Sequence, residues 1–257
     1  MTSPALTGRR VVVVGASAGI GRAFAVRAAR AGADLVLASR RLDALDGAVA
    51  EGGAGTALAL DVCDADSRSR FVAALAEGPP VDLVLVTVGV ASLRPLSETD
   101  DAAWTATLVT NLVGVAGLLA DLRPVLATDG VLAVLSSESG RRPRRGLVPY
   151  AASKAGLDAF LAGFRVEHPG TRVSCVVVGA TFPTEFGTGF EAQHLGPAME
   201  DWQRHGQLHQ QYMTPDEVAA VLQDVLAAAL RNPGVGIDEI VLRSPSPVLG
   251  TPTEERP

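Results

Sequence analysis

The stretch Val11-Val12-Val13-Val14-Gly15-Ala16-Ser17-Ala18-Gly19-Ile20-Gly21 decides the fold. An unbroken β-branched run is typical of a strand buried on both faces of a parallel sheet. The glycines permit a tight turn, and a helical pattern follows from about Gly21 to Arg30. Backbone N–H groups of such a turn can approach a pyrophosphate at the helix N-terminus, so the stretch predicts a dinucleotide site. The residues expected to bind it are Gly15, Ser17, Ala18, Gly19, Ile20 and Gly21.

Strand and helix patterns alternate along the rest of the chain. Parallel neighbouring strands need crossover helices, so this alternation predicts an α/β fold with a doubly wound parallel sheet of about seven strands and helices on both faces. A late helix near Pro215 to Leu230 has Thr214 as its expected N-cap. The expected strands after the first are Asp34 to Ala38, Thr56 to Leu60, Val81 to Val88, Val131 to Leu135, Val173 to Val178 and Glu239 to Leu242.

Composition limits the function classes. A chain of 257 residues with 47% hydrophobic and 4% aromatic residues fits one α/β domain over 1–257. A net charge of -6 argues against binding along nucleic acid. Cys63 and Cys175 form no paired motif, so we expect neither a disulfide framework nor a metal knuckle, and a cytoplasmic location. Met1 to Arg10 lacks a long apolar segment, so we expect no export signal and no membrane span.

Two segments break the α/β rhythm. Residues 184–213 hold three of the four histidines and little apolar periodicity, and long irregular insertions are often functional, so we expect a mobile substrate lid there. Residues 244–257 are rich in Pro, Ser and Thr and are expected to form a loose tail. His205 and His209 invite a metal hypothesis, but a zinc site needs at least three protein ligands, so we expect no metal.

The end of the second strand indicates which dinucleotide binds. An acidic residue there would accept hydrogen bonds from the ribose 2′-OH of NAD, but the chain has Ser39-Arg40-Arg41 instead. A guanidinium at this place suits a 2′-phosphate, which favours NADP, with NADPH preferred over NADH. The alternative is that both arginines merely solvate the start of a helix.

Tyr150-Ala151-Ala152-Ser153-Lys154 places a phenol and an ammonium on one helix face. A Tyr hydroxyl with a pKa near 10 is a poor acid or base at neutral pH, and a nearby cation brings that pKa closer to the working range. Taken alone, such a pair is more often a surface feature than a catalytic one.

Taken together, these motifs resemble the short-chain dehydrogenases/reductases, in their shorter single-domain branch. The resemblance covers nearly the whole chain and joins the glycine turn to the Tyr150–Lys154 signature. Ser137 lies thirteen residues before Tyr150, at the family's catalytic-Ser spacing, and Asn111 falls where the family has its active-site Asn. Further matches in the same order are Asp61-Val62 at the adenine end, Gly89 after the fourth strand, and Gly179 after the sixth.

The resemblance implies a Rossmann-type NADP(H)-dependent oxidoreductase of ketoreductase type, which moves a hydride between nicotinamide and a carbonyl or alcohol carbon. Tyr150 would be the general acid, Ser137 would hold the substrate oxygen, and Lys154 would bind the nicotinamide ribose and lower the pKa of Tyr150. Asn111 would anchor a water in a proton relay. Thr184, with Thr181 as a rival, would bind the carboxamide. The resemblance also implies a homodimer or homotetramer.

Departures from the family pattern leave an alternative open. The usual Asn-Asn-Ala-Gly stretch is replaced by Val86-Thr87-Val88-Gly89, which could loosen support of the sheet and the cofactor. This motivates a second hypothesis, a non-catalytic dinucleotide-binding sensor or scaffold on the same fold. The complete set of Ser137, Tyr150, Lys154 and Asn111 argues against it. An isomerase or dehydratase is a further rival, but such relatives usually carry a longer C-terminal substrate domain.

Four arginines lie between Ser137 and Tyr150, on a loop expected beside the substrate mouth: Arg141, Arg142, Arg144 and Arg145. The favoured interpretation is a solvated or subunit-contact loop. The alternative is an acidic substrate or carrier, such as a phosphopantetheine thioester, steered by local positive charge.

Overall fold

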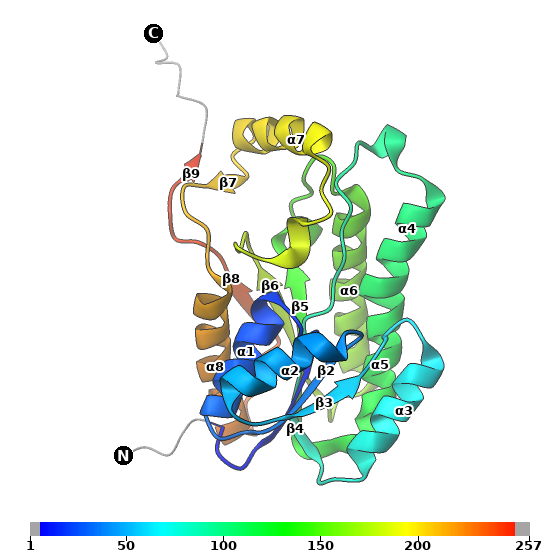
Figure 1. Cartoon of the computed structure of the whole chain (residues 1–257), viewed down its shortest axis with the longest axis vertical. Coiled ribbons are helices and arrows are strands. Elements are labelled where there is room, and N and C mark those ends of the chain that lie inside the picture. The colour runs from blue at the N-terminus through cyan, green and yellow to red at the C-terminus, as the bar shows by residue number, and fades with distance from the viewer. Residues whose placement is uncertain (1–5, 250–257) are drawn as a thin grey trace.

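A seven-stranded parallel sheet forms the centre of the computed structural model, which describes residues 6–249 (Figure 1). Its strand order is β3-β2-β1-β4-β5-β6-β8, so the chain reverses direction across the sheet between β1 and β4. Ligands of doubly wound sheets bind outside the carboxyl ends of the strands at such a switch point. The predicted sheet is confirmed, with strands β1 (Arg10–Val14), β2 (Asp34–Ser39), β3 (Thr56–Ala59), β4 (Val81–Val86), β5 (Leu126–Ser137), β6 (Arg172–Val178) and β8 (Glu239–Leu242).

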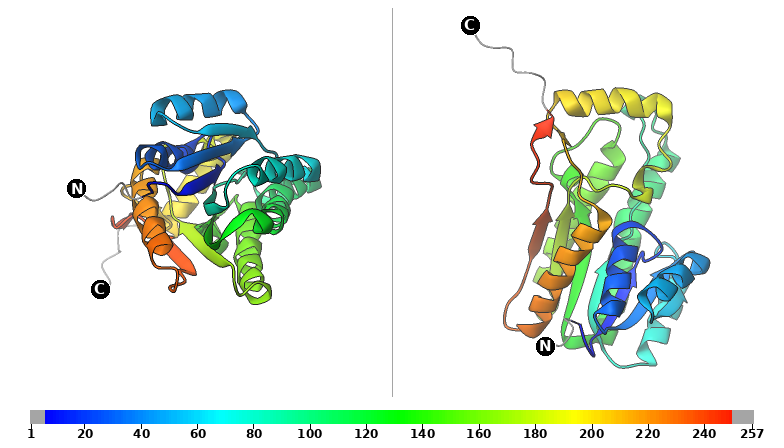
Figure 2. Two further views of the ribbon diagram at one scale, coloured as in Figure 1. Left: turned by 90° about the horizontal axis from the view of Figure 1, so that it is seen from below. Right: turned by 60° about the vertical axis from the view of Figure 1, so that its left-hand side comes forward.

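Helices cover both faces of the sheet (Figures 1 and 2). On β1, Val11 and Val13 belong to one hydrophobic core and Val12 and Val14 to the other, which is why the whole run is apolar. One core is covered by α1 (Gly19–Arg30), α2 (Leu42–Gly52) and α8 (Pro215–Arg231). The opposite core is covered by α3 (Ala65–Ala76), α5 (Val115–Leu122) and α6 (Val148–Glu167), with α4 (Asp101–Leu108) packed against α6.

The predicted start of α8 is correct, whereas both predicted ends of β5 are not. The Thr214 hydroxyl accepts a hydrogen bond from the Glu217 N–H at 3.2 Å, and the Glu217 carboxylate accepts one from the Thr214 N–H at 2.8 Å, so α8 begins with a capping box. β5 is longer than the predicted Val131 to Leu135, because it begins at Leu126 and ends at Ser137. That extension puts Ser137 at the carboxyl edge of the sheet.

The segment over the carboxyl edge is more ordered than its sequence suggests. Residues 184–213 contain η5 (Glu185–Gly187), α7 (Ala192–Arg204) and β7 (Leu208–His209), and Figure 1 shows α7 beyond the end of β5. α7 buries only Ala198 and Trp202, too few positions to give a clear periodic signal. Both join a small separate core with Leu93, Leu147 and Tyr150.

The region expected to be a loose tail also contains structure. Ser244 is buried, and β9 (Val248–Leu249) pairs antiparallel with β7. Residues 250–257 of the predicted tail lie outside the described residues. The stretch Ser244 to Leu249 is therefore not a loose segment, because it includes a strand that pairs with β7.

His205 and His209 do not share a helix. His205 follows the end of α7 and its ring contacts Asp201, whereas His209 lies on β7 with its Nδ1 3.0 Å from the carbonyl oxygen of Ser246. Among residues 6–249 no cluster of three or more His, Cys, Asp or Glu side chains could hold a metal ion.

The helical stretch Asp101–Val125 is the one described segment long and apolar enough to cross a membrane, with a mean hydropathy of 1.5. It comprises α4, η2 (Val109–Gly114), α5 and η3 (Arg123–Val125). Val115, Leu118, Leu119 and Leu122 are fully buried against the sheet, so the segment is an integral layer of this fold. A core helix passes the same test of length and composition.

Candidate active site and dinucleotide cleft

The turn after β1 requires glycine at three positions before and at the start of α1. Gly15 and Gly19 have φ values of +90° and +53°, which other residues rarely adopt. A Cβ on Gly21 would collide with the Gly15 carbonyl and the Thr87 hydroxyl. Ala18, the N-cap, gives the helix no side-chain hydrogen bond, so its first N–H groups are left for another acceptor. These features fit a dinucleotide pyrophosphate.

Thr87 supports this turn from β4. Its hydroxyl lies 3.0 Å from the Val14 carbonyl oxygen and 3.1 Å from that of Gly15, and its N–H donates to Val14 at 2.8 Å. The stretch Val86-Thr87-Val88-Gly89 therefore still holds the glycine turn to the sheet. The loosening that its sequence suggested is not seen at Thr87.

Ser39, Arg40 and Arg41 lie at the carboxyl end of β2, beside the glycine turn. The Ser39 hydroxyl donates to the Arg41 carbonyl at 2.8 Å and shapes the bend. The Arg41 guanidinium donates to the Ser17 hydroxyl at 3.3 Å and to the Glu185 carboxylate at 2.8 Å. Arg40 is exposed and has no hydrogen bond or ion pair within residues 6–249. Arg40 is thus available to an anion at this edge, whereas Arg41 is already paired with Glu185.

The turn after β3 is fixed by local hydrogen bonds. The Asp61 carboxylate accepts a hydrogen bond from the Cys63 N–H at 2.9 Å, and the Asp61 N–H donates to the Ser67 hydroxyl at 3.0 Å. Val62 is buried beneath it. The turn therefore offers a rigid rim to the cleft, at the place expected for an adenine.

Tyr150 and Lys154 lie on α6 facing the end of β5. Tyr150 is 8% exposed, and burial raises the pKa of its phenol, while the Ser137 hydroxyl and the charge of Arg144 oppose that rise. The positive charge of Arg144 thus acts on Tyr150 and lowers the pKa of its phenol. The Lys154 ammonium lies 6.0 Å from the centre of the Tyr150 ring.

Lys154 is buried at the floor of the site. Its ammonium donates to the Leu135 carbonyl at 2.8 Å, and burial lowers its pKa from 10.5 to about 8, opposed by the charge of Asp158. A Cβ on Gly89 would lie 3.5 Å from this ammonium, so the glycine leaves the approach to Lys154 clear.

Asn111 lies in η2, a π-helical segment between α4 and α5. Its amide accepts a hydrogen bond from the Val90 N–H and donates to the Val90 carbonyl, both at 2.8 Å, and also donates to the Ser153 hydroxyl at 3.0 Å. A π-helical turn re-aims side chains and is frequent at functional sites. Here it turns Asn111 toward α6 and holds the loop after β4 next to the active site.

The segment after β6 covers the site. The Phe186 ring packs edge-on against the Tyr150 ring with centroids 4.9 Å apart, and Phe190 packs on Phe186. Thr184 is the residue next to Gly19: a Cβ built on Gly19 would be 3.9 Å from the Thr184 methyl. Thr181 instead donates to the Gly179 carbonyl at 3.1 Å. The geometry thus favours Thr184 over Thr181 as a cofactor contact.

The arrangement matches a known family over most of its length. The family model for short chain dehydrogenases matches residues 9–194. The chain belongs to this family. Among curated relatives, glycine betaine reductase from Emericella nidulans is 31% identical over 92% of this chain, which spans only 19% of that longer protein. Sulfoacetaldehyde reductase from Chromohalobacter salexigens is 38% identical over 63% of this chain and 68% of its own length.

Solved structures of short-chain dehydrogenases share the fold. An alcohol dehydrogenase from Thermococcus sibiricus, solved in complex with 5-hydroxy-NADP, superimposes with a TM-score of 0.78 at 27% identity. The match covers 95% of this chain and 98% of that one.

Three contributors to this short-chain dehydrogenase site were not found from the sequence. The role of Thr87 was not predicted because its hydroxyl bonds to backbone carbonyls. A sequence motif does not reveal such contacts. Phe186 lies in a segment with no periodic signal. Arg144 was considered only as one of four arginines, and nothing in the sequence separates it from its neighbours.

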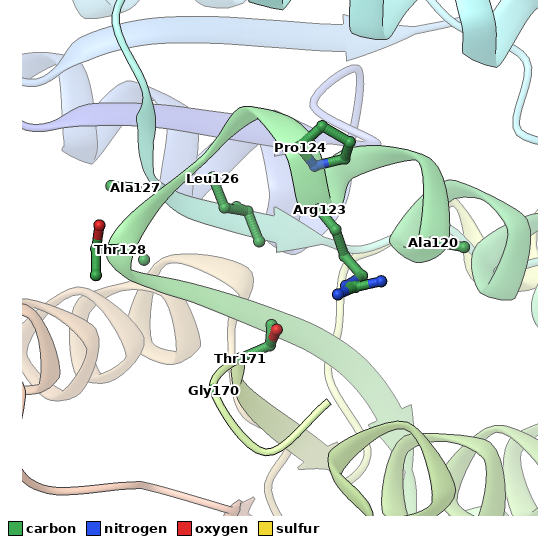
Figure 3. Close-up of a pocket in the computed structure, with 9 residues that line it drawn as sticks. Ala120, Arg123, Pro124, Leu126, Ala127, Thr128, Gly170 and Thr171 are labelled. Atoms are coloured by element: carbon green, nitrogen blue, oxygen red, sulfur yellow. The ribbon is translucent and has the colours of Figure 1, made fainter. Parts of the chain in front are cut away.

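A surface pocket of about 370 Å³ lies away from these residues. Figure 3 shows that its lining comes from the end of α5, the turn into β5 and the start of β6. β5 begins at this pocket and ends at Ser137, so the pocket and the catalytic residues lie at opposite ends of one strand. Ligands of this fold bind at the carboxyl ends of the strands, and we assign the pocket no part in the reaction.

Proposed function

We propose that the protein is an NADP(H)-dependent reductase of small carbonyl compounds, or the reverse alcohol dehydrogenase. The observation that carries the proposal is the convergence of Ser137, Tyr150 and Lys154 at the carboxyl edge of the sheet, beside the glycine turn. The proposed active centre and the proposed dinucleotide site would thus adjoin one another. The family's oxidoreductase activity agrees with this arrangement.

NADP is the proposed cofactor. The glycine turn would hold the pyrophosphate, Asp61 and Val62 the adenine end, and Thr184 and Gly179 the nicotinamide end. Arg40 and Arg41 would hold the 2′-phosphate, since β2 ends without an acidic residue. The complex of the Thermococcus relative with 5-hydroxy-NADP supports the same choice. When bound, NADPH supplies the hydride that reduces the carbonyl carbon.

Tyr150 is the proposed proton donor to the carbonyl oxygen. Its raised pKa keeps the phenol protonated at neutral pH. Negative charge develops on the substrate oxygen during reduction, and hydroxyl donors from Ser137 and Tyr150 stabilise it. In the reverse direction the same phenol would have to lose its proton, and the Arg144 charge then favours the phenolate.

Lys154 and Asn111 would support that proton transfer. With a pKa of about 8, Lys154 exchanges protons readily near neutral pH. Asn111 fixes the loop after β4 through two hydrogen bonds to Val90. It would thereby keep Gly89 and Val90 in position beside Lys154.

The proposal extends to the whole chain. Residues 1–257 would act as one dinucleotide-binding domain in the cytoplasm, with residues 184–213 as the substrate lid. The apolar outer surface of α4 and α5 would pair subunits into a homodimer or homotetramer, since only a third of the most apolar part of the Asp101–Val125 helix is buried within one chain. The name of the sulfoacetaldehyde reductase relative favours an aldehyde substrate.

The test is a titration with NADPH and NADH followed by a carbonyl screen. Tighter NADPH binding that weakens in Arg40→Ala, together with NADPH oxidation that disappears in Tyr150→Phe, would support the proposal. A ligand that binds only the native state raises its stability, so thermal shift reports the binding. Failure to bind either dinucleotide would refute the proposal. Tight binding with no turnover of any carbonyl would favour a dinucleotide-binding sensor instead.

A further inference from the structure

Arg144 is held in an unusual state for a buried arginine. Its side chain is only 14% exposed, yet its one ion pair is with Glu138 at 3.7 Å, and its guanidinium donates no hydrogen bond within residues 6–249. Arg68 is buried to the same degree at 16% and donates to Asp121 and to the Val62 carbonyl, each at 2.9 Å. Arg144 therefore keeps N–H donors that no other described residue accepts.

The other arginines of the loop do not share this state. Arg141 forms a two-pronged ion pair with Glu239 on β8. Arg145 is 58% exposed and lies 3.9 Å from Asp201, and the Arg142 side chain points to solvent. The four arginines of this stretch of sequence therefore differ in the fold. Arg141 pairs with β8, Arg142 and Arg145 are exposed, and Arg144 is set apart from all three.

The loop that carries Arg144 is anchored by the lid segment. The Trp202 indole N–H donates to the Arg145 carbonyl at 2.9 Å, and the Gln207 amide donates to the Pro143 carbonyl at 3.0 Å. The Arg144 guanidinium lies 5.8 Å from the centre of the Trp202 ring. A guanidinium fixed against an aromatic ring, with its backbone held on both sides, is pre-organised for a ligand.

Arg144 also faces the reacting centre. Its charge acts on Tyr150, while Glu138, its distant partner, immediately follows Ser137. The guanidinium remains charged, because arginine is not deprotonated in proteins, although burial lowers its pKa. The guanidinium is only partly buried, so its N–H groups stay accessible to a ligand, and an oxyanion could accept two parallel N–H bonds from it.

We propose that Arg144 binds the anionic end of the substrate, so that the preferred substrates are small aldehydes or ketones that carry a carboxylate or sulfonate group. This inference rests on the proposed reductase function and specifies its substrate class. The carbonyl oxygen would lie at Ser137 and Tyr150, and the oxyanion would lie against Arg144 under the lid. Arg144 is near enough for its charge to act on Tyr150 and lies 3.7 Å from Glu138, the residue after Ser137, so we expect a substrate with few bonds between carbonyl and anion.

The test compares succinic semialdehyde with its methyl ester, which differ in one negative charge. With NADPH, the wild-type protein should have a kcat/KM at least about 30-fold higher for the acid, since hydrogen bonds to charged groups contribute that much selectivity. Arg144→Met should abolish this preference, and Arg144→Lys should keep part of it. Arg142→Met, a change of the same size on the surface, should leave the preference unchanged.

Any effect of Arg144→Met on the pKa of Tyr150 acts on both substrates and cancels in the ratio of their kcat/KM values. NADPH affinity and the midpoint of thermal unfolding identify a misfolded variant. Equal loss of both activities in Arg144→Met, or a wild-type preference for the ester, would overturn the inference while leaving the reductase function in place.

A binding measurement makes the inference testable without turnover. Calorimetric titration of succinate into the NADP⁺-loaded protein should give binding that is lost in Arg144→Met and kept in Arg142→Met. Absence of turnover of any carbonyl would count against the reductase function alone. Absence of succinate binding to the wild-type complex would count against the role of Arg144.

Discussion

The guanidinium of Arg41 lies 2.8 Å from the carboxylate of Glu185, joining the end of β2 to the segment that covers the active site. Both side chains are more than half exposed, so the ion pair itself contributes little to stability. Its position matters more than its strength, because Arg41 also reaches Ser17 in the glycine turn. The pair lies where a 2′-phosphate would approach the protein.

Glu185→Gln is expected to tighten NADPH binding. A phosphate must share Arg41 with the Glu185 carboxylate and is repelled by it, so removing that charge should lower the Kd for NADPH by about two- to fivefold, in keeping with exposed ion pairs. NADH lacks the 2′-phosphate and should bind with nearly unchanged affinity. Fluorescence titration at low salt measures both affinities. A matched gain for NADH would instead show a general effect of loosening the lid.

Thr87→Val is expected to destabilise the fold. Valine has nearly the same shape but cannot donate to the Val14 and Gly15 carbonyls, so the free energy of unfolding should fall by ~1–2 kcal/mol. Thr87→Ser keeps the hydroxyl and serves as the control, with a smaller loss from its missing methyl group. Urea unfolding of the dinucleotide-free protein gives both values. Equal stability of Thr87→Val and wild type would remove Thr87 from the support of the glycine turn.

The sequence was sufficient where function depends on regular spacing. The helix spacing predicted that Tyr150 and Lys154 share a face, Ser137 was proposed from the family resemblance, and the β1 valines predicted a strand buried on both faces. It was insufficient where the backbone departs from regular geometry. The π-helical turn that aims Asn111 leaves no periodic trace, since the residues around it are as apolar as those of a regular helix.

Two adjacent arginines of the loop have very different surroundings. Arg144 and Arg145 follow one another, yet only Arg144 is buried, because Trp202 folds over it from a helix some 57 positions later in the chain. Contacts of such sequence separation cannot be inferred from composition. The position of Phe186 over Tyr150 was unpredictable for the same reason.

Lys154→Met is expected to stabilise the protein at neutral pH while abolishing activity. The pKa of Lys154 is depressed to about 8 in the fold from 10.5, so below pH 8 the charged ammonium is buried at a cost of roughly 1–3 kcal/mol. The unfolded chain binds more protons than the fold between about pH 8 and 10.5, so wild-type stability rises relative to the variant in that window.

The difference in unfolding free energy between Lys154→Met and wild type should therefore be largest at or below pH 7 and shrink as the pH approaches 10.5. Other titrating groups are common to both proteins and cancel in the difference. Urea unfolding at pH 7, 8.5 and 10 measures it. A difference that stays constant over this range would mean that Lys154 is not buried in its charged form.

Phe186→Ala is expected to move the alkaline limb of the activity profile. Burial raises the pKa of Tyr150, and the Phe186 ring, with its centroid 4.9 Å from that of Tyr150, supplies part of this burial. Reduction requires the protonated phenol, so kcat/KM falls as the pH passes the pKa of Tyr150. Removing the ring admits water, lowers that pKa toward 10 and should shift the alkaline limb to lower pH.

Phe190→Ala provides the matched control, because Phe190 contacts Phe186 but forms no ring contact with Tyr150 within residues 6–249. It should weaken substrate binding without shifting the alkaline limb. Measuring kcat/KM with NADPH between pH 7 and the alkaline limit of protein stability distinguishes the two variants. An equal shift in both variants would mean that the lid as a whole determines the pKa of Tyr150. A shift in Phe186→Ala alone would mean that the single contact between Phe186 and Tyr150 raises that pKa.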